Sequence, residues 1–465
     1  SLGFWKDQGM SRPTALSGFP EWLPSQRIVE QRVLEIVTRT FELHGFASLH
    51  SRAVEPLSQL LRKGETSKEV YVLSRLQETE AGSEGSARES KRDSDQLGLH
   101  FDLTVPFARY VLENAGQLTF PFKRYQIQPV WRGERPQDGR FREFWQADID
   151  VVGDGELPEH FEVEIPLIAA QALTALGELG LPPVRILVNN RKVPQGFYTG
   201  LGLGPVDDVL RIVDKLAKIG PAGVGAALRS ELGATDAQVE ACLALAEISG
   251  TDGVGAQVRD LAARFNVVDS TLDEGLEALD RLLASAALRA PGVVVADLSV
   301  ARGLDYYTGA VYETVLVGHE ELGSICSGGR YDALASDGKR TYPGVGISIG
   351  ISRVLSRLFT AGLTQATRSV PTAVLVAVSD EDSRSASDAV AAALRARGIP
   401  TDVAPTAAKF GKQIRFAERR GIPFVWFPET GEVKDIRSGD QAAAQASTWK
   451  PPAEDWWPRA VATSE

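Results

Sequence analysis

Apolar residues follow a helical period in some stretches of the chain and disappear from others. Over residues 25–44 the positions Ile28, Val33 and others recur near helical spacing, and Gly45 follows the last of them. This pattern predicts an amphipathic helix. Residues 77–97 are polar and rich in turn-forming residues, so we expect a loop or the tip of a hairpin there.

A second helix is expected at about 162–180, and it contains a proline. Proline fits the first turn of a helix but removes a hydrogen bond further along. Pro166 therefore indicates either that the helix begins near Ile165 or that it kinks.

A long helical block separates two strands. Residues 206–288 are dominated by Ala and Leu, and strands are expected on either side of them at 184–190 and 292–300. Capping boxes are expected at Thr235–Gln238 and Thr271–Glu274. A helical block between two strands of one sheet indicates an inserted domain.

The last part of the chain alternates between strands and helices. From about Pro371 the segments "TAVLVAVS", "TDVAP" and "IPFVWFP" are typical of strands, with helices expected between them at 382–397 and 411–420. This alternation predicts a small α/β domain with parallel strands. The tail at 447–465 has three tryptophans and no clear element.

Composition bounds the class of protein. The chain has 465 residues, 43% of them hydrophobic and 24% charged, which is typical of a soluble protein with two to four domains. No apolar run is long enough for a membrane span, and no secretion signal is visible. The net charge of -11 argues against indiscriminate nucleic-acid binding but leaves room for local basic patches.

Two cysteines, Cys242 and Cys326, form no disulfide framework and indicate a reducing, cytoplasmic setting. The five histidines show no ligand spacing, so a metal held by the protein alone is not expected. The first residue is Ser and the only methionine is Met10, so we interpret residues 1–9 as a remnant of cloning and Met10 as the natural start.

Four arginines surround a predicted turn, "RPQDGR", between two predicted strands. The guanidinium fork matches phosphate oxygens, which points to a bent triphosphate or an RNA end. The alternative is a solvated hairpin in which Glu134 and Glu143 pair with the arginines. The four are Arg132, Arg135, Arg140 and Arg142.

The next strand, "EFWQADIDVV", has one apolar and one polar face because side chains alternate along a strand. The polar face carries Gln146, Asp148 and Asp150, as expected for the floor of a polar cavity, although an edge strand facing water would look the same. Asp102 and Thr104 precede an apolar helix, where they either bind a ligand or simply start the helix.

The run "ARGLDYYTGAVYE" at 301–313 is expected to be mostly strand, yet it carries Arg302, Tyr306 and Tyr307. If both tyrosines line one cavity, a bulge or turn is required before them. Further on, Gly350 and Arg353 stand at a change from strand to helix, where an arginine can stack on a base.

Together these segments resemble the histidyl-tRNA synthetase family of class II aminoacyl-tRNA synthetases. "RGERPQDGR" is similar to motif 2 of the class, Gly350 to Arg353 to motif 3, and "RGLDYYTG" and "GGRYD" to two signature blocks of the family. "KFGKQIRFAERRGIPF" at 409–424 resembles the family's anticodon-binding domain. The likeness extends from about Gly18 to Gln441.

The resemblance implies an α+β catalytic core with an antiparallel sheet, a helical insertion and a C-terminal α/β anticodon-binding domain. The domains would be a catalytic domain at 10–370, an insertion within it at 191–289, and an anticodon-binding domain with the tail at 371–465. It also implies a cytoplasmic homodimer, without a membrane, that uses ATP and Mg²⁺ to join L-histidine to tRNA(His) through histidyl-adenylate.

The resemblance also implies roles for individual residues. Arg302 and Arg132 would be catalytic, close to the α-phosphate and the substrate carboxylate. The tRNA would contact Lys409, Lys412 and Arg415, in a stretch of net charge +4 at 409–420. ATP would be bound by Arg132, Glu134, Arg140 and Arg353, and histidine by Asp102, Thr104, Gln146, Asp150, Tyr306 and Tyr307.

Within this resemblance, Asp150 and Tyr307 would read the imidazole, since a carboxylate and a phenol together satisfy one ring donor and one ring acceptor. Two other functions remain open. One is the family's non-catalytic paralogue, a regulatory subunit of histidine biosynthesis, and the other is a synthetase for a different amino acid of the same subclass.

Overall fold

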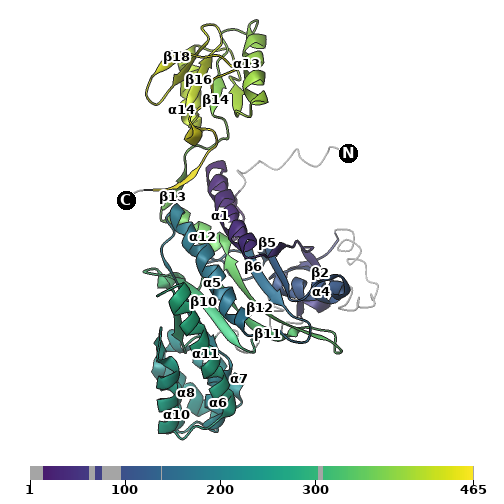
Figure 1. Ribbon diagram of the computed structural model, residues 1–465, viewed down its shortest axis with the longest axis vertical. Coiled ribbons are helices and arrows are strands. Elements are labelled where there is room, and N and C mark those ends of the chain that lie inside the picture. The colour runs from purple at the N-terminus through teal and green to yellow at the C-terminus, as the bar shows by residue number, and fades with distance from the viewer. Residues whose placement is uncertain (1–13, 62–68, 76–95, 138, 302–306, 464–465) are drawn as a thin grey trace, which may run out of the picture. The chain divides into compact units, whose positions relative to one another are not determined.

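A computed structural model of the chain describes residues 14–61, 69–75, 96–137, 139–301 and 307–463. Most of the polar segment expected to be a loop lies outside these residues, as do the proposed cloning remnant and Met10. The chain forms two compact units, each considered by itself below (Figure 1). The larger consists of Ser1–Pro20, Ile36–Gly177 and Pro182–Ser356, and the smaller of Glu21–Glu35, Glu178–Leu181 and Arg357–Glu465.

A nine-stranded mixed sheet forms the centre of the larger unit. Its middle strands run antiparallel, whereas β1 pairs with β5 and β7 pairs with β9 in parallel. In spatial order the strands are β1 (Ala47–Ser48), β5 (Phe122–Trp131), β6 (Glu143–Val152), β12 (Thr341–Gly350), β11 (Cys326–Ser336), β10 (Ala310–Leu316), β7 (Val184–Asn190), β9 (Val294–Asp297) and β8 (Ser249–Gly250).

Strand β6 lies between β5 and β12, so it is an inner strand and not the water-facing edge strand considered above. The register places Asp148 opposite Gln126 of β5 and Ser348 of β12. Because side chains alternate across the pleat, this row of polar residues shares a face with Gln146 and Asp150. A continuous polar surface thus crosses the centre of the sheet.

Helix α4 (Thr104–Asn114) packs on this sheet against β11, and helix α5 (His160–Ala175) packs against β12, β7 and β6 (Figure 1). Helix α5 runs through Pro166, so the expectation that it begins near Ile165 is wrong. The proline has no N–H to offer to the carbonyl of Glu162, one turn earlier. The buried Tyr312 hydroxyl donates to that carbonyl at 2.6 Å and so replaces the missing bond.

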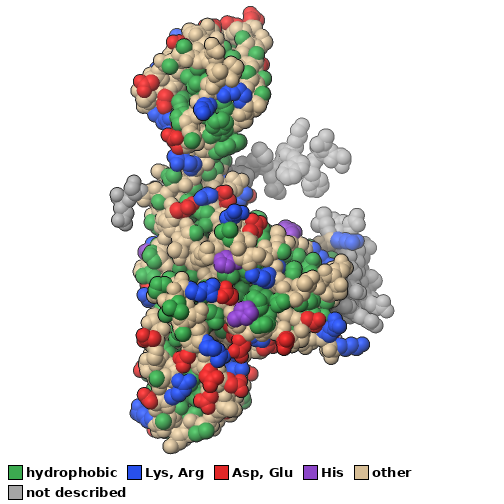
Figure 2. Space-filling view, in the orientation of Figure 1, with side chains coloured by type: hydrophobic (Ala, Val, Ile, Leu, Met, Phe, Trp, Pro, Cys, Tyr) green, Lys and Arg blue, Asp and Glu red, His purple; other side chains and the backbone are tan. Residues whose placement is uncertain are grey.

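The helical block connects β7 to β9, which are neighbours in the sheet as expected. Helix α11 packs on α6, β7 and β9, and Figure 2 shows side chains of both charges mixed over the outer surface of the block. Its helices are α6 (Lys192–Gly200), α7 (Val206–Val213), α8 (Leu216–Leu232), α9 (Asp236–Ala246), α10 (Val254–Arg264) and α11 (Ser270–Arg289).

One of the two expected capping boxes is confirmed and the other is wrong. Thr235 and Gln238 cap α9 reciprocally. Helix α11 begins earlier than expected, and its cap is Asp269, whose carboxylate accepts from the backbone N–H groups of Thr271 at 2.8 Å and Leu272 at 3.2 Å. Aspartate is among the strongest capping residues, so it supersedes the threonine two positions later.

Smaller elements complete this part of the chain. Helix α1 (Pro24–Leu43) begins and ends within one residue of its expected limits. A three-stranded sheet stands apart from the large one, in the order β2 (Val54–Pro56), β4 (Leu97–Leu99) and β3 (Val72–Leu73), with the short α2 (Leu57–Leu60) after β2, and α12 (Ile351–Thr360) follows β12.

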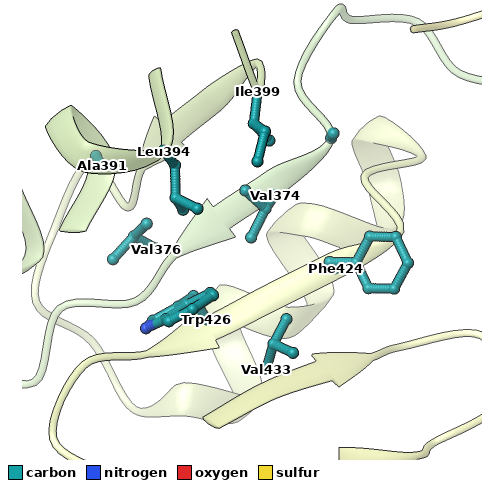
Figure 3. Close-up of a cluster of buried hydrophobic side chains, with 9 residues drawn as sticks. Val374, Val376, Ala391, Leu394, Ile399, Phe424, Trp426 and Val433 are labelled. Carbon is teal, nitrogen blue, oxygen red and sulfur yellow. The ribbon is translucent and has the colours of Figure 1, made fainter. Parts of the chain in front are cut away.

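The smaller unit contains a five-stranded sheet, whose first three strands are parallel as expected and whose last two run antiparallel. Figure 3 shows one side of its core, where Val374, Leu394 and Trp426 meet. The strands are β15 (Thr401–Val403), β14 (Val374–Val376), β16 (Phe424–Phe427), β17 (Glu432–Asp435) and β18 (Gln441–Ala443), and the helices are α13 (Arg384–Ala396) and α14 (Phe410–Arg420).

The tail, for which the sequence predicted no element, is well ordered against this core. Trp449 makes edge contacts with Phe424 and Trp426, with ring centroids 5.5 and 5.6 Å apart. The indole of Trp456 donates to the carbonyl of Gly398 at 2.9 Å. Beyond it, β19 (Ala460–Ala462) pairs with β13 (Thr364–Ala366).

None of the helices in the described part of the chain is both long enough and apolar enough to cross a bilayer.

The capping of α11 can be tested by substitution. We expect Asp269→Ala to lower the free energy of unfolding by about 1 kcal/mol, because two backbone N–H groups lose their acceptor. Thr271→Ala, the matched control, should cost only a few tenths of that amount. Urea unfolding of both variants measures the difference, and equal losses would restore Thr271 as the cap.

Candidate active site

Two adjoining cavities open on the polar face of the large sheet. The smaller has a volume of about 90 Å³ and the larger about 450 Å³. Their shared walls include Arg132 and Gln146, so a ligand in one would touch a ligand in the other. The smaller is lined by Asp102, Thr104, Arg132, Gln146, Asp148, Asp150, Tyr307, Ser327, Gly328, Tyr331, Gly346, Ile347 and Ser348.

A buried ion pair forms the floor of the smaller cavity. Arg124 of β5 is fully buried, and its guanidinium lies 2.8 Å from Asp150 Oδ2 on β6. The hydroxyl of Tyr331 donates to Asp150 Oδ1 at 2.7 Å. A Cβ at Gly346, opposite on β12, would stand 2.0 Å from that same oxygen, so only glycine fits there.

Asp148 lies beside this pair and is 2% exposed. Burial raises the pKa of its carboxyl to about 7, and the negative charges of Asp150 and Asp102 act in the same direction. Arg124 and the Ser348 hydroxyl oppose the shift. Asp148 therefore titrates near neutral pH, far above the ordinary range of an aspartate.

The other end of the smaller cavity is formed by Asp102 and Thr104, at the start of α4. Asp102 is buried, and its Oδ1 accepts from the backbone N–H of Val105 at 3.0 Å. Asp102 thus serves the helix start, as one alternative had it, and it also lines the cavity, whereas ligand binding by this residue stays a prediction.

Tyr307 lies on the cavity wall, whereas Arg302 and Tyr306 are outside the described residues. Strand β10 covers only the last four residues of the run, from Ala310, and the described residues before it are not strand, whereas 302–306 lie outside the described residues. A Cβ at Gly329 would stand 2.7 Å from the ring of Tyr307, and this glycine lets the ring approach the backbone of β11. Burial raises the pKa of Tyr307, with Asp150 adding to the shift, so its phenol stays protonated.

The larger cavity holds two arginines in fixed positions. Arg353 of α12 donates to the carbonyls of Ser324 and Leu322, at 2.5 and 2.6 Å. Arg132 donates to the carbonyl of Phe101 at 3.0 Å and lies over the ring of Phe144, 5.1 Å from its centroid. Both guanidinium groups are held before any ligand arrives.

Two further predicted residues, Glu134 and Arg140, also line the larger cavity, together with Glu313 of β10. The turn that carries Arg140 closes with paired backbone hydrogen bonds between it and Gln137. Arg135, by contrast, lines neither cavity. The solvated-hairpin alternative does not describe Arg132 and Arg140, because both line a cavity.

Arg330, in the "GGRYD" segment, lies elsewhere. Its guanidinium binds Glu162 and Asp332, each at 3.0 Å, and the carbonyl of Leu157 at 3.2 Å. This arginine joins β11 to α5 and lines neither cavity. Its glycine neighbours therefore do not mark a ligand contact at position 330.

In the smaller unit, Lys409, Lys412 and Arg415 are exposed at the N-terminal end of α14. Arg420, at the other end of the helix, is instead paired with Asp402 at 2.8 Å. The part of the stretch that stays available to an anionic partner is the solvent-facing side of α14.

Fold and site together define the class. A sheet with an antiparallel centre, adjoining polar cavities on one face, and a separate α/β unit with a basic helix are the features of a class II aminoacyl-tRNA synthetase.

Comparison with known proteins narrows this further. The family model described as "Histidyl-tRNA synthetase" matches residues 18–354, and that described as "Anticodon binding domain" matches 372–435. Proteins named histidine–tRNA ligase from Cutibacterium acnes and Micrococcus luteus are each 56% identical, over 98% and 97% of this chain and 100% and 99% of theirs. A crystal structure of histidyl-tRNA synthetase from Nostoc sp. PCC 7120 is 33% identical, with a TM-score of 0.79 over 93% of this chain and 97% of that one. The chain belongs to the histidyl-tRNA synthetase family.

Among the residues not singled out as ligand contacts from the sequence are Asp148 and Tyr331, which line the smaller cavity, and Arg124, which lies beneath its floor. The polar face of β6 did include Asp148, so the alternation signal was present. Arg124 gave no signal, because an arginine on a strand is ordinarily interpreted as exposed. Tyr331 was not predicted as a cavity residue, because the neighbouring Arg330 gave the stronger chemical signal.

The raised pKa of Asp148 has a consequence for stability. The folded value near 7 exceeds the ordinary value of 3.8, so the folded state keeps a proton that the unfolded chain releases. Stability is therefore lost as pH rises from about 4 through about 7. We expect Asp148→Asn to remove this loss and to raise the free energy of unfolding by a few kcal/mol at about pH 8 and by much less at about pH 5.

Denaturant unfolding of the ligand-free protein at the two pH values measures this difference. Asp154→Asn, on the exposed turn after β6, is the matched control and should change neither value. A gain for Asp148→Asn of the same size at both pH values would contradict the assignment.

Proposed function

We propose that this protein joins L-histidine to tRNA(His) in two steps, with ATP first giving histidyl-adenylate and pyrophosphate. Membership of the family makes it a histidine–tRNA ligase. The observation that carries the detailed proposal is the pair of adjoining cavities: a small acidic one beside a larger one with fixed arginines.

Histidine occupies the smaller cavity. Asp150 and Tyr307 read the ring, because a carboxylate and a phenol together offer an acceptor and a donor to a neutral imidazole. Tyr306 lies outside the described residues, and its part in histidine binding stays a prediction from the family resemblance. Asp102, Thr104 and Gln146 take the α-amino end. A heterocycle without ring nitrogens would leave these buried groups unpaired, which strongly disfavours its binding.

ATP occupies the larger cavity. The adenine stacks on the Arg353 guanidinium, whose plane is fixed by two carbonyl acceptors. Arg132 stands where both cavities meet, so it reaches the substrate carboxylate and the α-phosphate together. Glu134 orients the nucleotide, and Arg140 holds the bent phosphates.

The chemical step is an in-line attack of the histidine carboxylate oxygen on the α-phosphorus, with pyrophosphate leaving. Negative charge builds up on the phosphate oxygens, and arginines that are already in place stabilise it without reorganising. Arg302 lies outside the described residues, and its catalytic role stays a prediction from the family resemblance. Mg²⁺ bound to ATP would be held by the carboxylates of Glu134 and Glu313 at the cavity wall, where it would neutralise part of the phosphate charge.

The tRNA is held in part by the smaller unit, through Lys409, Lys412 and Arg415. The domain division that we propose is a catalytic domain at 10–370 with an insertion at 191–289, followed by an anticodon-binding domain and tail at 371–465. We also propose a cytoplasmic homodimer. Both described cysteines are free and buried, consistent with a reducing compartment.

The alternative of a regulatory subunit is disfavoured by two features. Arg132 and Arg353 are both held in the larger cavity, and the anticodon-binding model matches residues 372–435. A synthetase for another amino acid is disfavoured by Asp150, which places a carboxylate in the substrate cavity.

ATP–pyrophosphate exchange tests the proposal. Exchange should require histidine and no other amino acid. Arg353→Ala should raise the KM for ATP about tenfold or more while leaving that for histidine nearly unchanged, because it removes a nucleotide contact. Arg259→Ala, on the surface of α10, is the control. Exchange with a different amino acid, or none at all in the unaltered protein, would refute the function.

The basic surface of α14 makes a separate prediction. We expect Lys412→Ala/Arg415→Ala to weaken tRNA binding and to reduce the slope of log K against log salt by about 1 to 2, since each lost phosphate contact removes roughly one unit. Arg384→Ala/Arg395→Ala, on α13 of the same unit, removes as much charge from another surface. Filter binding over a salt series compares the two, and identical slopes would exclude α14 as the contact.

A further inference from the structure

Two buried oxygen atoms on β6 accept no hydrogen bond from the residues that the structure describes, and both lie on the smaller cavity. They are Asp148 Oδ1 and Gln146 Oε1. The two residues are separated by one position, so their side chains leave the same face of the strand. Buried polar atoms are nearly always paired in folded proteins, and a pair of exceptions at one cavity calls for an explanation.

The surroundings of Asp148 do not supply a donor to Oδ1. Gln126 lies opposite on β5, but its amide donates to Ser51 Oγ at 2.8 Å and also to Gln128. The Ser348 hydroxyl, opposite on β12, acts on the Asp148 carboxyl as a donor that lowers its pKa, yet it makes no hydrogen bond of normal geometry to Oδ1. Arg124 sends its guanidinium to Asp150, at 2.8 Å.

The charge of the smaller cavity leads to the same conclusion as the unpaired oxygen atoms, namely that a donor from a ligand belongs there. Among the described residues, the smaller cavity is lined by three aspartates, Asp102, Asp148 and Asp150, against one arginine, Arg132, with Arg124 beneath the floor. Within this described set, one negative charge is left over when all three acids are ionised. Other titratable groups near Asp148 are Tyr307 and Cys326, which are neutral at physiological pH because burial raises the pKa of each.

A ligand group that satisfies these conditions has several N–H donors and a positive charge. A primary ammonium group has three donors and no acceptor, whereas a neutral imidazole has a single donor. The two unpaired oxygens and Asp102 offer three acceptors. Asp150 is the less available acid, because Arg124 and Tyr331 already bind its two oxygens.

We propose that Asp148 is a further specificity-determining residue, which binds the α-ammonium group of the amino acid together with Gln146 and Asp102. The inference rests on the proposed function and adds a contact to it. Asp148 selects a substrate with a free α-amino group, and Asp150 and Tyr307 select the ring. The raised pKa of Asp148 agrees with a carboxylate that awaits a cation.

The test compares two ligands that differ only at the α-amino group: histidine and 3-(imidazol-4-yl)propionate. Titration calorimetry measures both with the unaltered protein and with Asp148→Asn, which keeps the shape of the side chain. We expect the variant to bind histidine about 10-fold to 100-fold more weakly and the desamino compound equally well, because only the charged contact is lost.

Two controls separate this role from a structural one. Asp154→Asn, on the exposed turn after β6 and away from the cavity, should leave the ratio of the two affinities unchanged. Thermal unfolding of the ligand-free Asp148→Asn protein should occur at a higher temperature than that of the unaltered protein, whereas histidine should stabilise the variant less. If Asp148 merely supported the fold, Asp148→Asn would lower both the unfolding temperature of the ligand-free protein and the stabilisation by histidine.

The outcomes are distinct. Equal weakening of both ligands in Asp148→Asn would overturn the inference in favour of a ring contact or a structural role, as would unchanged binding of both. If the unaltered protein binds neither ligand and shows no histidine-dependent exchange, the proposed function itself fails.

Discussion

The ion pair between Arg124 and Asp150 is the constraint around which the polar face of the sheet is built. Both side chains are buried, so leaving either charge unpaired would cost free energy of folding. The pair occupies facing positions on β5 and β6, and Tyr331 reaches it from β11. Position 346 is a glycine, and the absence of a side chain there leaves room for the Asp150 carboxylate. Four strands thereby fix a single position for one acidic group.

Around this pair, the two cavities have opposite electrostatic character. The smaller carries an excess of carboxylates, and the larger is lined by arginines whose guanidinium groups are already held by backbone carbonyls. In the proposed function, a zwitterionic amino acid placed across the boundary would direct its ammonium group to the acids and its carboxylate to Arg132. This arrangement would orient the carboxylate towards the nucleotide before any bond is made.

Side chains from distant segments compensate for local irregularities of the fold. Tyr312 satisfies the carbonyl that Pro166 leaves without a donor, and this keeps α5 continuous across the back of the sheet. In the smaller unit the tail supplies Trp449 to the core and Asp455 to Arg437, 2.8 Å away. These are long-range contacts, and their local sequence carries little sign of them.

Period and composition alone determined the helix at the N-terminus, the helical block between β7 and β9, the alternating α/β unit and the polar face of β6. Those features are local, since the spacing of apolar residues sets which face is buried. The catalytic segments could be found only through their resemblance to a family. The burial of Arg124, the unpaired oxygen of Asp148 and the order in the tail were decided by the tertiary structure. Each depends on which strands become neighbours, and a single sequence does not reveal strand order, because pairing partners lie far apart along the chain.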